Sequence, residues 1–120
     1  MNKNFLTNLL KNDKTSSFQT TRYSSLEECI KIQNLNSHPI IEMNQTHSNN
    51  IEIVGLQKEK ILISNTDAII TSYKKQVLVT KTADCLPILI YHPLPIVAAI
   101  HAGRKGTEKN ILSNVIKTLI

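Results

Sequence analysis

A series of short runs of aliphatic, mostly β-branched residues occupies the chain from residue 39 onward. The runs are residues 40–41, 51–54, 61–63, 68–70, 77–79, 86–91 and 96–100. Each is too short for a helix, and turn-forming or charged residues separate most of them. This pattern predicts a succession of strands, so β-sheets are expected to form most of the core.

Two segments predict helices beside these strands. Residues 25–34 begin with the capping-box pair Ser25 and Glu28 and then place an apolar stripe on one face. Cys29 lies on that stripe, which favours a buried helix residue over a metal ligand. We expect an α/β (α+β) fold, a mixed β-sheet with flanking helices.

The last segment also repeats apolar residues at helical spacing, with Thr107 as the predicted N-cap. The stripe continues to Ile120 without a stop signal, which indicates a chain shortened relative to something longer.

The composition limits the class of protein. A length of 120 residues with 41% hydrophobic content predicts one domain over residues 1–120. The apolar runs are far shorter than a membrane span, and the N-terminus lacks the pattern of a secretory signal. We therefore expect a cytoplasmic protein without membrane contact, whose two cysteines are free or metal-bound.

The net charge of +5 raises the possibility of a nucleic-acid partner. The lysines are spread along the chain, however, and the five aromatic residues form no stacking motif. We interpret the charge as a solvated basic surface and expect no nucleic-acid partner. A small basic binding module is the weakest of the functional hypotheses.

Three residues with metal-binding side chains lie at junctions of the predicted strands: His47, Cys85 and His101. Side chains at strand ends can converge on one pocket although they are distant in sequence. Two imidazoles and one thiolate suit zinc, and three protein ligands leave a fourth position open, as in catalytic zinc sites. The spacing matches no zinc-finger pattern, so a buried cysteine and two ordinary histidines remain the alternative.

Residues around this set suggest further roles. Gly103 and Gly106 flank Arg104 and Lys105 before the last predicted helix. This segment either binds an anion such as phosphate or is an ordinary strand-to-helix turn. Asp67 and Asp84 could orient a ligating histidine or act as a general base. For Asp67 the sequence favours a turn residue bonded to local backbone amides.

Four segments, in this order, carry a family resemblance: NQTH at 44–47, TDAIIT at 66–71, KTADCLPIL at 81–89 and AAIHAGRKG at 98–106. Together they resemble the bacterial purine nucleoside phosphorylase family formerly described as multicopper polyphenol oxidases or laccase-domain proteins. The resemblance covers roughly residues 40–118.

This resemblance implies a layered α/β fold and a zinc ion held by His47, Cys85 and His101. It also implies phosphorolysis of adenosine, inosine, guanosine and methylthioadenosine, and deamination of adenosine to inosine. Asp84 is then the candidate for proton handling, and Arg104 and Lys105 for phosphate binding. The older description of the family implies copper and polyphenol oxidation, which is the competing hypothesis.

The chain also departs from the family pattern. Arg104 and Lys105 occupy positions where the family usually has tryptophan followed by arginine, and a glycine-rich stretch near the N-terminus is missing. The C-terminal half of family members is absent. The fold is therefore expected to be incomplete relative to the family's layered fold. The second hypothesis is an inactive remnant, or a chain that needs a complementary chain for the missing half.

Overall fold

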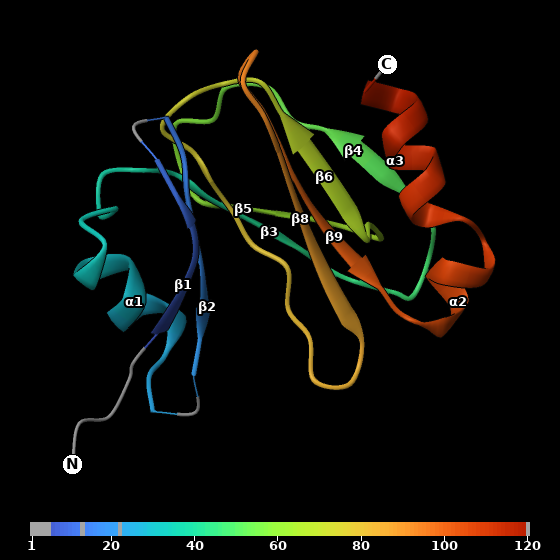
Figure 1. Cartoon of the computed structure of the whole chain (residues 1–120), viewed down its shortest axis with the longest axis horizontal. Helices are drawn as coiled ribbons and strands as arrows, with labels where there is room; N and C mark the ends of the chain where they lie inside the picture. The colour runs from blue at the N-terminus through green and yellow to red at the C-terminus, as the bar shows by residue number, and fades with distance from the viewer. Residues whose placement is uncertain (1–5, 13, 22, 120) are drawn as a thin grey trace. The chain divides into compact units, whose positions relative to one another are not determined.

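The computed structural model describes residues 6–12, 14–21 and 23–119, and the chain divides into two compact units (Figure 1). Unit 1 is Met1–His38 and unit 2 is Pro39–Ile120. The expectation of a single domain stays a prediction. Both units combine strands with short helices, so the expected α/β class is confirmed.

Unit 1 contains a hairpin that the sequence did not predict. Strands β1 (Leu6–Lys11) and β2 (Ser16–Thr20) pair antiparallel. The Asn12 side chain organises the turn, because its Oδ1 accepts the backbone N–H groups of Lys14 and Thr15 at 2.8 and 2.9 Å. The sequence gives no signal for this hairpin, because no residue of either strand is buried and no apolar alternation marks the strands.

Helix α1 (Leu26–Ile32) follows the hairpin and confirms the predicted helix. The Ser25 hydroxyl accepts the Glu28 N–H at 3.2 Å, and the Glu28 carboxylate accepts the Ser25 N–H at 3.2 Å. This reciprocal capping satisfies two donors that a helix N-terminus leaves free. Cys29 is fully buried, as the apolar stripe predicted.

Unit 2 contains two sheets. The smaller has the order β5-β3-β7 and consists of parallel pairs between β3 (Ile40–Met43) and its neighbours β5 (Ile61–Ile63) and β7 (Val77–Leu78). The larger has the order β4-β6-β9-β8 and is mixed. Its strands are β4 (Ile51–Ile53), β6 (Ala68–Thr71), β8 (Leu86–His92) and β9 (Ile96–Ala102). Every predicted strand is present.

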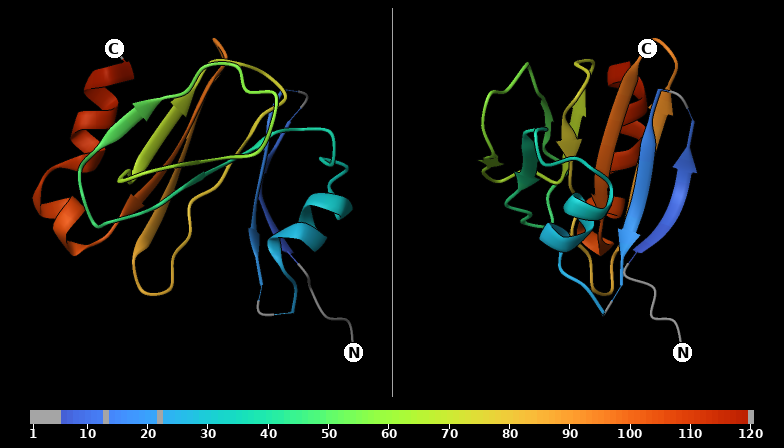
Figure 2. Two further views of the ribbon diagram at one scale, coloured as in Figure 1. Left: turned by 180° about the vertical axis from the view of Figure 1, so that it is seen from behind. Right: turned by 90° about the vertical axis from the view of Figure 1, so that its left-hand side faces the viewer.

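Strands β6 and β9 lie at the centre of the larger sheet, and both of its faces are covered. Ile70 and Ile100 pack on one face with Ile111 and Val115 of the last helix, whereas Ile69 packs on the other face against the smaller sheet. Figure 2 shows this last helix lying along the larger sheet. Full burial of such side chains contributes about 1.5–3 kcal/mol each, so these strands are held firmly in register.

Two short helices follow β9, where the sequence predicted one. Helix α2 (Arg104–Glu108) has Gly103 as its N-cap, and α3 (Ile111–Leu119) carries the apolar stripe. Thr107 therefore lies inside α2, and its prediction as an N-cap was wrong. The break comes at Asn110, whose φ of 62° is left-handed and cannot continue a helix. Within the described part of the chain, no helix is long and apolar enough to cross a bilayer.

Candidate metal centre

Three side chains from distant parts of unit 2 converge at one end of the larger sheet. His47 lies in the loop after β3, Cys85 directly precedes β8, and His101 is the penultimate residue of β9. Their ligand atoms all lie within 4.8 Å of one another. His47 is exposed, Cys85 is half-buried and His101 is 4% exposed, so the cluster opens to solvent on the His47 side.

Strand register explains why these residues meet. Leu86 of β8 pairs with Ala102 of β9, so Cys85 falls beside the end of the strand that carries His101. On the other side of β9, the His101 N–H donates to the Asp67 carbonyl at 2.7 Å. The β8–β9 and β6–β9 pairings thus bring Cys85, His101 and Asp67 to the same end of the larger sheet.

Asp67 connects both histidines of the cluster. Its fully buried carboxylate contacts His101 Nδ1 at 2.7 Å through Oδ2. The same carboxylate accepts the backbone N–H groups of Thr46, His47 and Ser48 at 3.0, 3.2 and 2.9 Å. It also accepts the Ser48 hydroxyl at 2.7 Å. One side chain therefore orients one imidazole and holds the loop that carries the other.

These contacts determine the charge of Asp67 and the tautomer of His101. Burial raises the pKa of the Asp67 carboxyl, but hydrogen bonds from His101, Ser48 and Thr46 outweigh it and lower the pKa to about 2. The carboxylate is therefore ionised at neutral pH and can only accept hydrogen bonds. Nδ1 of His101 must then donate, which leaves the lone pair of Nε2 free for a metal ion.

His47 has an unusual backbone conformation. Its φ of 60° is in the left-handed region, which costs a residue with a Cβ about 1–3 kcal/mol. The three backbone N–H groups bound to Asp67 compensate for this cost and keep the loop curled. The two imidazole rings consequently meet edge to face, with centroids 5.2 Å apart and planes at 66°.

Gly103 leaves the space in which the cluster assembles. A Cβ added at this position would lie 3.0 Å from His47 Nδ1 and 3.1 Å from Cys85 Sγ. Both distances are shorter than ordinary van der Waals contacts, so the His47 imidazole and the Cys85 thiol would have to shift by a few tenths of an ångström to make room for a Cβ. Glycine lets the backbone at the start of α2 approach the cluster without that shift.

The donor set fits a single divalent ion. Imidazole nitrogen and thiolate sulfur bind zinc at about 2.1 and 2.3 Å, which places tetrahedral ligand atoms about 3.5 Å apart. The three atoms already lie within 4.8 Å of one another, a difference that side-chain rotations can close. Three ligands leave one coordination position for substrate or water, as in catalytic sites.

Comparison with known proteins decides the family. The family described as multi-copper polyphenol oxidoreductase laccase matches residues 8–120. The chain belongs to this family. Its curated relatives include a purine nucleoside phosphorylase of Campylobacter jejuni, 36% identical over 95% of this chain and 53% of the relative. A purine nucleoside phosphorylase of Rickettsia conorii is 33% identical over 87% of this chain and 48% of the relative. The chain thus spans about half the length of these relatives.

The fold of the family is also known from solved structures. The hypothetical protein YfiH of Bacillus licheniformis superimposes with a TM-score of 0.70 and 26% sequence identity. The match covers 75% of this chain and 37% of YfiH. The resemblance recognised in the sequence is therefore confirmed.

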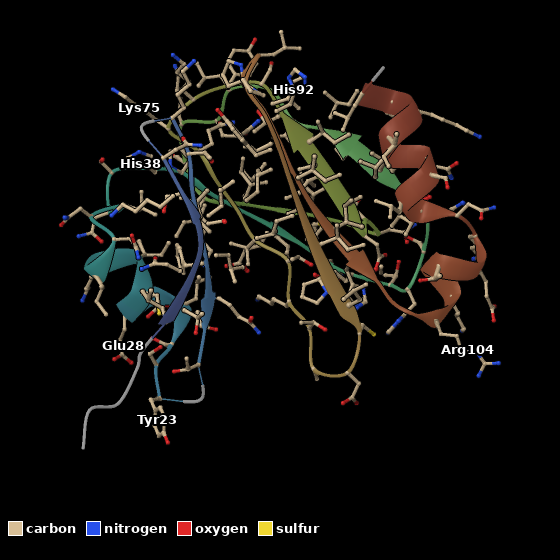
Figure 3. The ribbon with its side chains drawn as sticks, in the orientation of Figure 1. Tyr23, Glu28, His38, Lys75, His92 and Arg104 are labelled. Carbon is tan, nitrogen blue, oxygen red and sulfur yellow. The ribbon has the colours of Figure 1, made fainter. Side chains whose placement is uncertain are left out.

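The other candidate residues are close in sequence to members of the cluster. Asp84 is exposed in the loop directly before Cys85. Arg104 and Lys105 begin α2 and are both exposed. Figure 3 shows the Arg104 side chain pointing away from the ribbon, and its Nε lies 3.4 Å from Glu108 Oε1 in an exposed (i, i+4) pair. Their roles in this family member stay predictions.

The structure corrects one interpretation and adds two residues. Asp67 does accept backbone amides, but they belong to residues 46–48 and not to its own turn, so the interpretation as a local turn residue was wrong. Gln45 and Ser48 were missed, although both flank the predicted ligand His47 within two residues. Proximity to His47, and for Gln45 its place in the segment NQTH, were the available signals, because their partners lie at distant sequence positions.

Replacing Gly103 with alanine is expected to lower zinc affinity about tenfold, the lower end of the usual effect of disturbing the support of a ligand. The new methyl group would occupy the space next to His47 Nδ1 and Cys85 Sγ and separate the ligands. Zinc competition with a chromogenic chelator measures the effect. Gly55→Ala is the matched control, because a Cβ at Gly55 meets nothing within 4 Å. Equal zinc affinity in the two variants would contradict the packing argument.

Asp67 should also give folding a pH dependence. Its pKa in the folded chain is about 2, below the ordinary value of 3.8, so its contribution to stability is complete above about pH 4. The contribution is lost as the pH falls from about 4 towards 2. The free energy of unfolding of metal-free protein against pH measures this loss.

The control for this pH dependence is the Asp67→Asn variant. Burial raises the pKa of Glu42, but Lys81 and Lys60 lower it overall, so Glu42 titrates in the same direction. Both proteins share the contribution of Glu42, so it cancels in the difference between their free energies of unfolding. Parallel stability curves for the two proteins below pH 4 would contradict the assignment to Asp67.

Proposed function

We propose that this chain carries the zinc site of a purine nucleoside phosphorylase that also deaminates adenosine. The observation that supports this best is the cluster of His47, Cys85 and His101, whose ligand atoms lie within 4.8 Å of one another. It occurs in a chain whose curated relatives are named purine nucleoside phosphorylases. Zinc is proposed over copper because two imidazoles and a thiolate with one open position form a typical catalytic zinc set.

The proposed roles follow from the positions of the side chains. His47, Cys85 and His101 hold the ion, and Asp67 keeps His101 in the tautomer that can bind it. A bound zinc ion would supply a Lewis acid with one open coordination position. The exposed imidazole of His47 marks the side from which a nucleoside can approach.

Two reactions are proposed at this site. In phosphorolysis, a phosphate oxygen forms a bond to the sugar carbon while the bond to the purine nitrogen breaks, and the departing purine takes up a proton. In deamination, a water oxygen forms a bond to the purine carbon that carries the amino group, and ammonia leaves. Arg104 and Lys105 are the proposed phosphate contacts, and the exposed Asp84 beside Cys85 the proposed proton carrier.

The experiment that tests this function combines metal analysis with product analysis. Purified protein should contain about one zinc per chain, and copper in its place would favour the oxidase hypothesis. Incubation with adenosine should release inosine, and adenine should appear only when phosphate is added. The His101→Ala variant is the control. A zinc-loaded wild type whose product level equals that of the variant would contradict the proposal.

We further propose that full activity needs a complementary polypeptide. The chain spans 53% of its Campylobacter jejuni relative. In unit 2 the side chains of Ile53, Leu62 and Leu86 are 67%, 63% and 60% exposed, which suits contact with another chain. Co-expression with the C-terminal half of that relative should raise activity above that of the chain alone. Equal activity with and without the added half would contradict this requirement.

The proposed compartment rests on the ligand thiol of Cys85, which forms no disulfide bond. A reducing compartment keeps a ligand thiol available for metal, so we propose that the activity is cytoplasmic.

A further inference from the structure

The loop at residues 80–85 carries Cys85 and connects β7 to β8. Gln45 forms two hydrogen bonds with one residue of this loop. Its Nε2 donates to the Lys81 carbonyl at 2.7 Å, and its Oε1 accepts the Lys81 N–H at 2.8 Å. The side-chain amide therefore pairs with the Lys81 backbone as a neighbouring strand would. The Thr80 hydroxyl adds a longer contact to the same Oε1 at 3.4 Å.

Few other interactions hold this loop. Lys81 Nζ lies 3.0 Å from Glu42 Oε2, but the lysine side chain is 63% exposed, so this ion pair contributes little. The Thr82 hydroxyl donates to the Cys85 carbonyl, which closes the loop on itself without tying it to the sheet. Across the described ranges, hydrogen bonds from residues 80–85 to the rest of the chain run to Gln45 and Glu42.

Gln45 is also only two positions from His47. The segment that carries His47 therefore also carries the side-chain amide that hydrogen-bonds the loop at residues 80–85. Asp67 holds the same segment at residues 46–48 and orients His101. Hydrogen bonds to residues 45–48 thus support the segments that carry His47 and Cys85, in addition to the β8–β9 pairing that places Cys85 beside the end of β9.

We propose that Gln45 is a positioning residue of the metal centre. By pairing with the Lys81 backbone it fixes the loop at 80–85, so that Cys85 Sγ meets the ligand nitrogens of His47 and His101. This inference rests on the proposed zinc site. It adds a residue that is not itself a ligand, and it explains how the loop that ends at Cys85 is held before metal binds.

The test compares Gln45→Ala with Gln76→Ala as matched control. Gln76 likewise supports a loop, the one between β4 and β5, because its Oε1 accepts the Gln57 N–H at 2.6 Å. This hydrogen bond does not involve the loop at residues 80–85. Gln45→Ala should lower zinc affinity about 10- to 100-fold, the usual effect of losing a residue that supports a ligand. In the cobalt-substituted protein it should weaken the thiolate-to-cobalt absorption band. Gln76→Ala should leave both unchanged.

A second measurement needs no metal. In metal-free protein, Cys85 should be alkylated several-fold faster in Gln45→Ala than in wild type, because its loop is released. Peptide mass spectrometry separates Cys85 from Cys29, which is fully buried. If Gln45→Ala does not fold, zinc affinity and the alkylation rate of Cys85 are measured on Gln45→Glu instead. That variant keeps the side-chain volume but sets a carboxylate oxygen against the Lys81 carbonyl, and it should shift both measurements in the same direction.

The outcomes separate this inference from the proposed function. Unchanged zinc affinity in a folded Gln45 variant, together with an unchanged alkylation rate, would overturn the role of Gln45 and leave the zinc site intact. A wild type that binds no metal would overturn the proposed function. The alkylation rates would then still show whether Gln45 holds the cysteine loop.

Discussion

Replacing Cys85 with serine is expected to weaken zinc binding more than about 100-fold, beyond the usual effect of losing a supporting residue. The thiolate is the only anionic ligand of the cluster, and a serine hydroxyl stays protonated at neutral pH. The two remaining imidazoles cannot hold the ion against a competing chelator. Affinity is measured by chelator competition, and in the cobalt-substituted protein the thiolate-to-cobalt band should disappear.

The matched control for this prediction is Cys29→Ala. Cys29 is the other thiol of the chain, but it is fully buried in α1 and is not part of the cluster. The control should lose some stability because a small cavity remains, while its zinc affinity stays at the wild-type value. If Cys85→Ser kept the wild-type zinc affinity, the ligand assignment would be wrong.

Asp67→Asn is expected to disable the metal site by changing the tautomer of His101. An asparagine can keep one oxygen towards the three donors of Thr46 and Ser48. Its amide NH2 group then replaces Oδ2, so it faces His101 Nδ1 and no longer accepts the His47 N–H. Nδ1 must then accept, so the proton moves to Nε2, the nitrogen that would bind the ion. Zinc affinity should fall about 10- to 100-fold.

The stability of Asp67 variants provides an independent measurement. Asp67→Ala removes the acceptor of five donors at once in a fully buried position. Each buried group left without a partner costs about 1–3 kcal/mol, so this variant should lose several kcal/mol in urea unfolding. Asp67→Asn should lose less stability than Asp67→Ala while binding zinc poorly. Asp84→Asn, at an exposed position, is the control and should unfold like wild type.

A result in which Asp67→Asn binds zinc as well as wild type would show that the tautomer is not set by this carboxylate. A small stability loss in Asp67→Ala would show instead that water replaces the carboxylate. The two measurements therefore test separate parts of the geometry, the orientation of one imidazole and the anchoring of the loop at residues 46–48.

Most elements of unit 2 could be predicted from the sequence because each is a local pattern. Short β-branched runs separated by turn residues predicted every strand from β3 to β9, and the capping box predicted α1 in unit 1. The β1–β2 hairpin was not predicted, because none of its strand residues is buried and no apolar alternation marks it. The division of the last helical segment into α2 and α3 was not predicted, because it depends on the left-handed backbone of Asn110.

For the metal centre, the sequence by itself determined the ligand types, their places at strand ends and the family likeness. Only the tertiary structure decided that the three ligand atoms lie within 4.8 Å of one another, because that follows from how β8, β9 and β6 pair. It also decided the supporting roles of Asp67, Gln45 and Gly103. Their partners lie far away in the sequence, so no local pattern could have identified the contacts.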